Sequence, residues 1–105
     1  MDPMELIAFN IISNVGMAKS LAVEALREVR GGNKELAAEK LKEADGYMVE
    51  AHHSHAELIQ KEASGEKVEF SLILMHAEDQ MLSAETIKEL VKEMIEMYND
   101  LKGNK

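Results

Sequence analysis

Apolar residues recur every three or four positions through three long stretches of the chain, and Gly31-Gly32 and Ser64-Gly65 interrupt them. This spacing puts apolar side chains on one face of an α-helix. It predicts one all-α domain of 105 residues, with helices over about residues 3–30, 34–64 and 69–102. Because breaks of a few residues force neighbouring helices to run antiparallel, we expect an up-down-up three-helix bundle.

The first predicted helix has distinct signals at its start. Asp2 can cap free backbone N–H groups, Pro3 falls at the first helical position, and Glu5 completes a capping box. Asn33 can cap the second helix in a similar way. The third helix has no comparable signal, so its start is expected only within residues 68–71.

The charge and composition of the chain exclude several classes of function. Twelve basic and twenty acidic side chains give a net charge of −8, and such a surface repels nucleic acids and anionic lipids. The absence of cysteine excludes disulfides, thiolate zinc sites and cysteine nucleophiles. No apolar run approaches the roughly 20 residues that a membrane span requires, and the N-terminus lacks the features of a signal peptide. We therefore expect a cytoplasmic protein.

The beginning of the third helix differs from the rest of the chain because residues 70–75 are almost continuously apolar. This pattern predicts burial on more than one side. A monomeric three-helix bundle leaves one face of each helix in water, so we expect other subunits to cover the head of this helix.

The apolar run leads directly to His76 and Asp79, which share one helix face because they are three residues apart. An imidazole nitrogen is a competent nucleophile near neutral pH, since its unperturbed pKa of about 6.5 leaves much of it unprotonated. A single histidine on an apolar helix is nevertheless more often a hydrogen-bonded interface residue. The spacing alone leaves both interpretations open.

Three stretches of the chain are similar to a known family. They are residues 11–20 with Glu24-Ala25-Leu26, Glu50-Ala51-His52 with Leu58-Ile59, and residues 71–79. Through them the chain resembles, from about Glu5 to about Leu101, the enzyme IIA component of the bacterial sugar phosphotransferase system, lactose/cellobiose (also chitobiose) branch. The third stretch is the most specific, because the family pattern there is an apolar run followed by His-Ala-Gln-Asp-His.

The resemblance implies a relay function for one residue. His76 falls on the histidine that accepts a phosphoryl group from the phosphocarrier HPr and passes it to the cysteine of the cognate enzyme IIB. The family works with a membrane enzyme IIC in the uptake and phosphorylation of a β-linked disaccharide of the cellobiose, lactose or chitobiose type. No nucleotide-binding loop is visible in the sequence, so no nucleotide cofactor is expected.

The resemblance also implies an assembly and a metal. These subunits are homotrimers, with nine helices around a threefold axis. Asp79 falls on the aspartate that three subunits bring together around a divalent metal, commonly magnesium. Three converging carboxylates repel each other strongly, so a cation or protons must neutralise them.

The chain departs from the family pattern next to this site. Glu78 replaces a usual Gln, and its added negative charge is expected to disfavour the phosphorylated form or to alter docking. Gln80 replaces a usual His, which removes a possible hydrogen-bonding or protonatable partner. His52 matches a family histidine and is expected to line the groove near His76, whereas His55 replaces a usual Gln.

Two other functions compete with the relay. The altered Glu78 and Gln80 also fit a non-catalytic trimeric scaffold that has kept the fold and lost the relay activity. The cluster of His52, His53 and His55 suggests a histidine-based metal store, although a dedicated zinc site needs further ligands in defined geometry. The sequence offers only scattered glutamates for that purpose.

Overall fold

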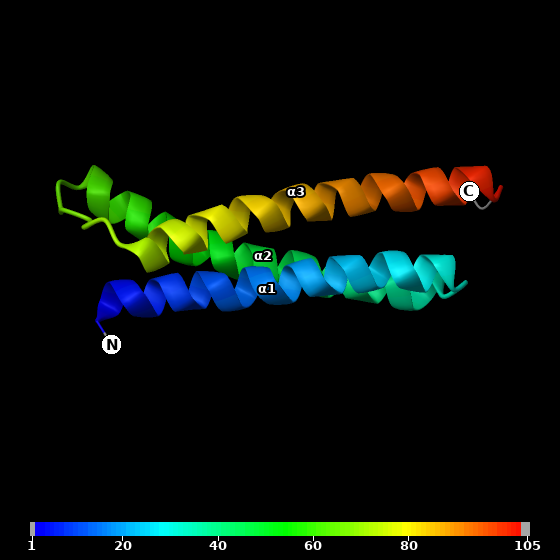
Figure 1. Ribbon diagram of the computed structural model, residues 1–105, viewed down its shortest axis with the longest axis horizontal. Helices are drawn as coiled ribbons and strands as arrows, with labels where there is room; N and C mark the ends of the chain where they lie inside the picture. Colours follow the sequence, from blue (N-terminus) through cyan, green and yellow to red (C-terminus); the bar gives the residue numbers. More distant parts are fainter. Residues whose placement is uncertain (1, 104–105) are drawn as a thin grey trace.

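The computed structural model describes residues 2–103, which form three helices and no strand. The helices are α1 (Pro3–Arg30), α2 (Lys34–Ala63) and α3 (Leu72–Leu101). Figure 1 shows α1 and α3 running in one direction and α2 in the other, so the predicted all-α, up-down-up bundle is confirmed. The molecule is 54 Å long, in keeping with the roughly 45 Å that a helix of 30 residues spans.

The first helix begins where its capping signals predict. The Asp2 carboxylate accepts hydrogen bonds from the backbone N–H groups of Met4, at 2.8 Å, and Glu5, at 3.0 Å. At the other end, Gly32 has a φ of +88°, a conformation that glycine adopts without the strain a Cβ would cause. The chain can therefore reverse within three residues. Asn33 precedes α2 as predicted, but its side chain makes no capping hydrogen bond.

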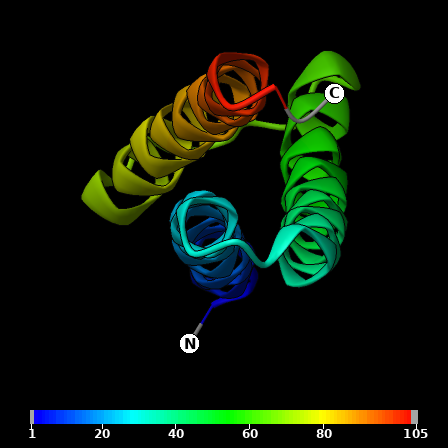
Figure 2. The same ribbon diagram turned by 90° about the vertical axis from the view of Figure 1, so that its right-hand side faces the viewer.

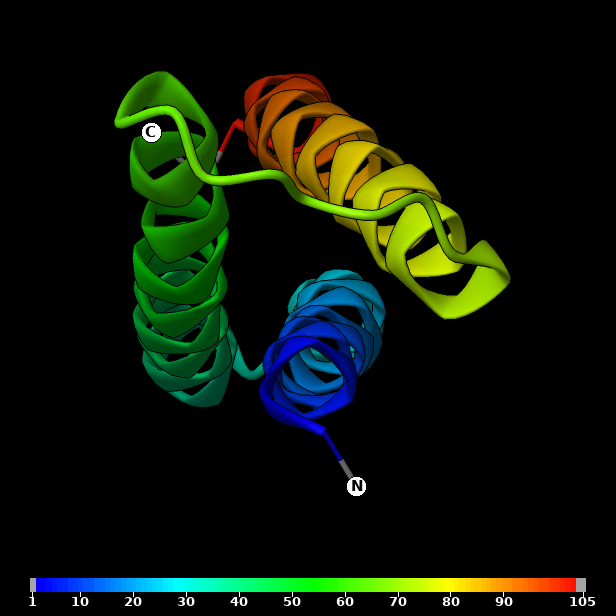
Figure 3. The same ribbon diagram turned by 90° about the vertical axis from the view of Figure 1, so that its left-hand side faces the viewer.

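The third helix begins later than predicted. Its first residue is Leu72, and the Ser71 hydroxyl caps it by accepting a hydrogen bond from the Leu74 N–H at 3.1 Å. Residues 66–70 have no regular secondary structure, and the backbone of Ser71 is extended. Figure 3 shows the reason, because this segment has to cross from the end of α2 to the distant head of α3. A helix rises only about 1.5 Å per residue, so an extended segment covers the span with fewer residues.

The hydrophobic core lies along α1, which packs against both other helices, as the end-on views in Figures 2 and 3 show. Many core residues are alanines, whose small side chains let the helices approach closely. The largest fully buried side chains are those of Ile11, Val15 and Met48. The main cluster consists of Ala8, Ile11, Val15, Ala18, Leu21, Ala44, Met48, Ala51, Leu58, Ala77, Met81 and Ala84.

The central position of α1 also explains its apolar composition. By its length and apolar composition α1 also qualifies as a candidate membrane span, which was not expected from the sequence. Its most apolar positions, such as Ile11 and Val15, face α2 and α3 inside the bundle. The core helix of a soluble bundle and a membrane span share this composition, and here the apolar face is used for packing.

The chain by itself does not bury the head of α3 on more than one side. Ile73 and Leu74 pack against the core, but Phe70 and Leu72 remain 79% and 72% exposed. Half of the Met75 side chain surface is also exposed. The physical reason is that α3 diverges from α2 at this end (Figure 3), so no helix of the same chain covers its outer side.

Candidate functional site

His76 lies in the second turn of α3, and its side chain is exposed. The adjacent Ala77 is fully buried against the other helices, which fixes the rotation of α3 and turns His76 outward. Asp79 and Gln80 follow His76 by three and four residues, so they are its neighbours along the same side of the helix. Asp79 is exposed as well, whereas Gln80 is half-buried.

The Gln80 side chain connects the site to α1. Its carbonyl oxygen accepts a hydrogen bond from the Lys19 ammonium group, with 3.3 Å between Nζ and Oε1. A long side chain on a helix leans toward the N-terminal turn, which for Gln80 is the turn that carries His76. From the sequence we predicted only that a usual histidine is missing at position 80. The structure shows in addition that Gln80 contacts Lys19, which is 61 residues earlier in the chain.

Glu78 does not point toward the side of α3 that carries His76. Two residues along a helix differ by about 200° in direction, and the Glu78 side chain reaches α2 instead. There its carboxylate oxygen Oε1 lies 3.0 Å from His55 Nε2. The sequence led us to expect an added negative charge beside His76. This effect is reduced because the Glu78 carboxylate faces α2 and has a histidine partner there.

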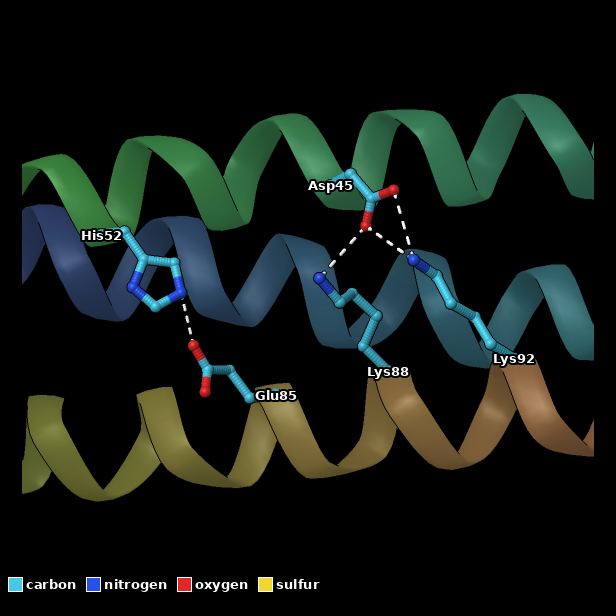
Figure 4. A network of polar contacts seen from close by, with 5 residues as sticks. All are labelled: Asp45, His52, Glu85, Lys88 and Lys92. Atoms are coloured by element: carbon cyan, nitrogen blue, oxygen red, sulfur yellow. Dashed lines mark hydrogen bonds and ion pairs between the residues drawn. The ribbon is translucent and has the colours of Figure 1, made fainter.

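His52 lies further along the bundle than the sequence suggested. It contacts Glu85 of α3 (Figure 4), and Glu85 is nine residues beyond His76, or roughly 13 Å along the helix. His52 lines a groove between α2 and α3 together with His55, Glu78, Met81, Leu82 and Glu85. Within one chain the structure therefore does not bring His52 next to His76, because the facing helices set a different register.

The seam between α2 and α3 is polar along most of its length. Asp45 of α2 contacts both Lys88 and Lys92 of α3, with N–O distances of 3.2 and 3.3 Å (Figure 4). Together with the two histidine–glutamate pairs, these polar contacts link α2 to α3 outside the apolar core that the two helices share with α1. The contacts of Asp45 with Lys88 and Lys92 were not predicted, because a helical pattern does not indicate which charged residues of two helices will face each other.

The histidines of α2 do not form a metal centre. His52 and His55 each contact a different glutamate, and residues 2–103 contain no group of three or more His, Cys, Asp or Glu side chains arranged to hold a metal ion. Asp79 supplies one exposed carboxylate per chain. The metal-store function therefore has no ligand set within a single subunit.

Along its outer side, α3 carries a continuous stripe of exposed residues, which we call the outer stripe. Its members recur every three or four positions and are apolar except for Asp79 and Thr86, and His76 lies at its edge. Burying such a stripe against another surface is favourable, because apolar area is removed from water. The outer stripe consists of Leu72, Met75, Asp79, Leu82, Thr86, Leu90, Met94, Met97 and Leu101.

These features define a class of protein, a small helical subunit that presents one histidine at the edge of an unpartnered apolar face. The family model of the PTS system, lactose/cellobiose specific IIA subunit, matches residues 6–99. The chain belongs to this family of sugar phosphotransferase components, and it therefore shares their role as sugar-specific phosphate carriers.

Individual relatives agree with the family match over nearly the whole chain. The lichenan-specific phosphotransferase enzyme IIA component of Bacillus subtilis is 41% identical over 100 residues, covering 95% of this chain and 91% of that protein. The lactose-specific EIIA component of Streptococcus mutans is 37% identical and covers 89% of each chain. The crystal structure of the cellobiose specific enzyme IIA from Bacillus anthracis superposes with a TM-score of 0.94 at 43% identity, covering 100% of this chain and 96% of that one.

Proposed function

We propose that this chain relays a phosphoryl group through His76, taking it from HPr and giving it to the cysteine of a cognate enzyme IIB. The observation that carries the proposal is the exposure of the His76 side chain beside a partly buried Lys19–Gln80 contact. A relay residue must be reached by two other proteins in turn, and an imidazole on the surface of a rigid helix meets that need.

The proposed chemistry is an in-line exchange between two imidazoles. One ring nitrogen of neutral His76 attacks the phosphorus of the donor phosphohistidine while its other nitrogen keeps a proton. The N–P bond to His76 forms as the N–P bond of the protonated donor ring breaks, so the donor leaves as a neutral imidazole and no proton is gained or lost. Such a transfer requires mainly positioning and charge stabilisation from the protein.

The outer stripe supports a homotrimer in which three copies of α3 pack around a common axis. Its apolar residues would be covered there, including the head of α3 that the single chain leaves exposed. Asp79 lies within the stripe, so three carboxylates would meet at the axis. Carboxylate oxygens suit a hard divalent cation such as Mg²⁺, and the ion or bound protons would relieve the repulsion between the three charges.

The proposed relay also determines which proteins this chain binds and where in the cell it acts. HPr and enzyme IIB dock transiently around His76, in the cytoplasm, and a membrane enzyme IIC takes up the sugar. Because the relatives are named for lichenan, lactose and cellobiose, a β-linked disaccharide is the proposed substrate of the complete system. The bundle itself, with two Phe, two Tyr and no Trp, has few aromatic side chains on which a sugar can stack.

The alternative of a scaffold without relay activity rests on Glu78 and Gln80. Both side chains have partners elsewhere, His55 for Glu78 and Lys19 for Gln80. Neither substitution therefore covers the His76 ring, which favours the relay.

The test is to incubate the protein with phosphoenolpyruvate, enzyme I and HPr and to measure its intact mass. We expect a gain of one phosphoryl group that is labile in acid and stable in base. His76→Ala should abolish the gain, and His53→Ala, which alters an exposed histidine of α2, should keep it. If the wild-type chain gains nothing while an active family member does, the scaffold is the better description. If His76→Ala is still labelled, the relay residue is a different one.

A further inference from the structure

The Lys19 ammonium group contacts Gln80, a residue one helical turn after the proposed relay residue His76. We propose that the Lys19 ammonium group is the cation that binds the phosphoryl group while that group is attached to His76. In the unphosphorylated chain Lys19 donates to the neutral amide oxygen of Gln80, and on phosphorylation it turns to the phosphoryl oxygens. This inference rests on the proposed function and adds to it a residue of α1.

The first argument is the charge that the site must accept. A phosphoryl group carries about −1.5 to −2 charges at pH 7, and the chain already has a net charge of −8. A nearby cation therefore has a large effect on whether the phosphorylated form is stable.

The second argument is reach. Gln80 is four residues after His76, so their Cβ atoms are about 5–6 Å apart on the helix surface. Long helical side chains generally lean toward the preceding turn, which for Gln80 is the turn that carries His76, and Lys19 Nζ lies 3.3 Å from the Gln80 side-chain oxygen. A lysine has four rotatable bonds in its side chain, and rotation about them is what the proposal requires to carry the ammonium group from Gln80 to a phosphoryl group on the imidazole.

The third argument is the partner that Lys19 has now. Lys40 lies 2.8 Å from the Glu24 carboxylate, and Lys88 lies 3.2 Å from the Asp45 carboxylate. Lys19 instead contacts a neutral amide. A doubly charged phosphoryl group is a much stronger acceptor than an amide oxygen, so exchanging one for the other is favourable for Lys19.

The experiment compares four variants in equilibrium with HPr and phospho-HPr. Lys19→Met should lower the ratio of phosphorylated to free protein by roughly tenfold, the effect of losing a hydrogen bond to a charged group. Lys19→Arg should recover most of the loss because it keeps the charge. Gln80→Ala should also retain most of the phosphorylation, since the ammonium group is still present. Lys40→Met is the control, because Lys40 is also partly buried but lies near the start of α2. It should be phosphorylated to the same extent as the wild type.

These variants separate a direct role from a positioning role. If Gln80→Ala loses as much phosphorylation as Lys19→Met, Lys19 acts only by holding Gln80, and the proposal is wrong. If Lys19→Met is phosphorylated like the wild type while the wild type and Lys40→Met are active, the Lys19 proposal fails and the relay function stays intact. If the wild type is not phosphorylated at all, the relay function itself fails.

A second measurement needs no substitution. Phosphorylating the wild-type chain should shift the Nζ resonance of Lys19 in a ¹⁵N NMR spectrum of the lysine ammonium groups, and leave that of Lys40 in place. A Lys19 signal that does not move would overturn the proposal even if Lys19→Met proved too unstable to study.

Discussion

The Nε2 atom of His55 lies 3.0 Å from Oε1 of Glu78, so two residues that depart from the family pattern are partners across the α2–α3 seam. The resemblance described above gives Gln as the usual residue at both positions, whereas this chain has Glu78 and His55. Each side chain therefore provides a polar partner for the other. The contact also directs the Glu78 carboxylate to α2, away from the side of α3 that carries His76.

This pairing predicts that the two substitutions are coupled energetically. His55→Gln and Glu78→Gln should each lower the free energy of unfolding, and the double variant should lose less than the sum of the two. Because the side chains are 25% and 53% exposed, the coupling energy should be about 0.2–1 kcal/mol. Urea unfolding of the four proteins measures it, and strictly additive effects would show that the contact contributes nothing.

The Asp45 carboxylate is expected to be the strongest charged contact of the seam. Asp45→Asn weakens contacts to both Lys88 and Lys92, and Lys88 is only 18% exposed. We expect a loss of about 1 kcal/mol in unfolding free energy, which should shrink at high salt because the ions screen the charges. Glu57→Gln, an exposed acid of α2, is the control. A loss that is equal for both variants, or unaffected by salt, would contradict the assignment.

The Asp2 cap of α1 should make the free energy of unfolding of the bundle depend on pH under acidic conditions. The backbone N–H of Glu5 donates to the Asp2 carboxylate and holds its pKa below the usual 3.8. Because the folded-state pKa is lowered, the stabilisation is complete above pH 3.8 and is lost as the pH falls through the folded-state pKa.

To test the cap, the melting temperatures of the wild type and Asp2→Asn are compared. The asparagine keeps a hydrogen-bond acceptor at the helix N-terminus but carries no titrating charge. The wild type should melt at a higher temperature at pH 6, since a negative charge is favourable at a helix N-terminus. The difference should shrink below pH 3.8. A difference in melting temperature that stays constant down to pH 2.5 would rule out ionised Asp2 as its source.

The outer stripe of α3 predicts the oligomeric state. The wild type should have about three times the 11.7 kDa mass of one chain, as measured by light scattering. Met97→Glu puts a charge into the stripe at a side chain that is 62% exposed in one chain, and it should yield folded monomers. Val49→Glu changes a side chain of α2 that is 60% exposed and should leave the trimer intact. A wild-type monomer, or equal effects of both variants, would contradict a trimer built on this stripe.

The helices and their order followed from the sequence because they depend on local chemistry. Asp2 and Pro3 start α1 and the Gly31-Gly32 pair ends it, so its predicted range of about 3–30 agrees with the observed Pro3–Arg30. The apolar period fixed which side of each helix would be buried, as Ile11, Val15 and Met48 show. The motif around His76 also identified the family, since it depends on residue identity alone.

The start of α3 and the pairing of charged side chains were decided by tertiary structure. Ser71 caps α3 only because residues 66–71 must stay out of the helix to reach across from α2. Lys19 meets Gln80, and His55 meets Glu78, across 61 and 23 residues of sequence. The helical period predicts the direction in which a side chain points, but not which residue of the neighbouring helix it meets. That residue depends on the crossing angle and axial shift of the two helices.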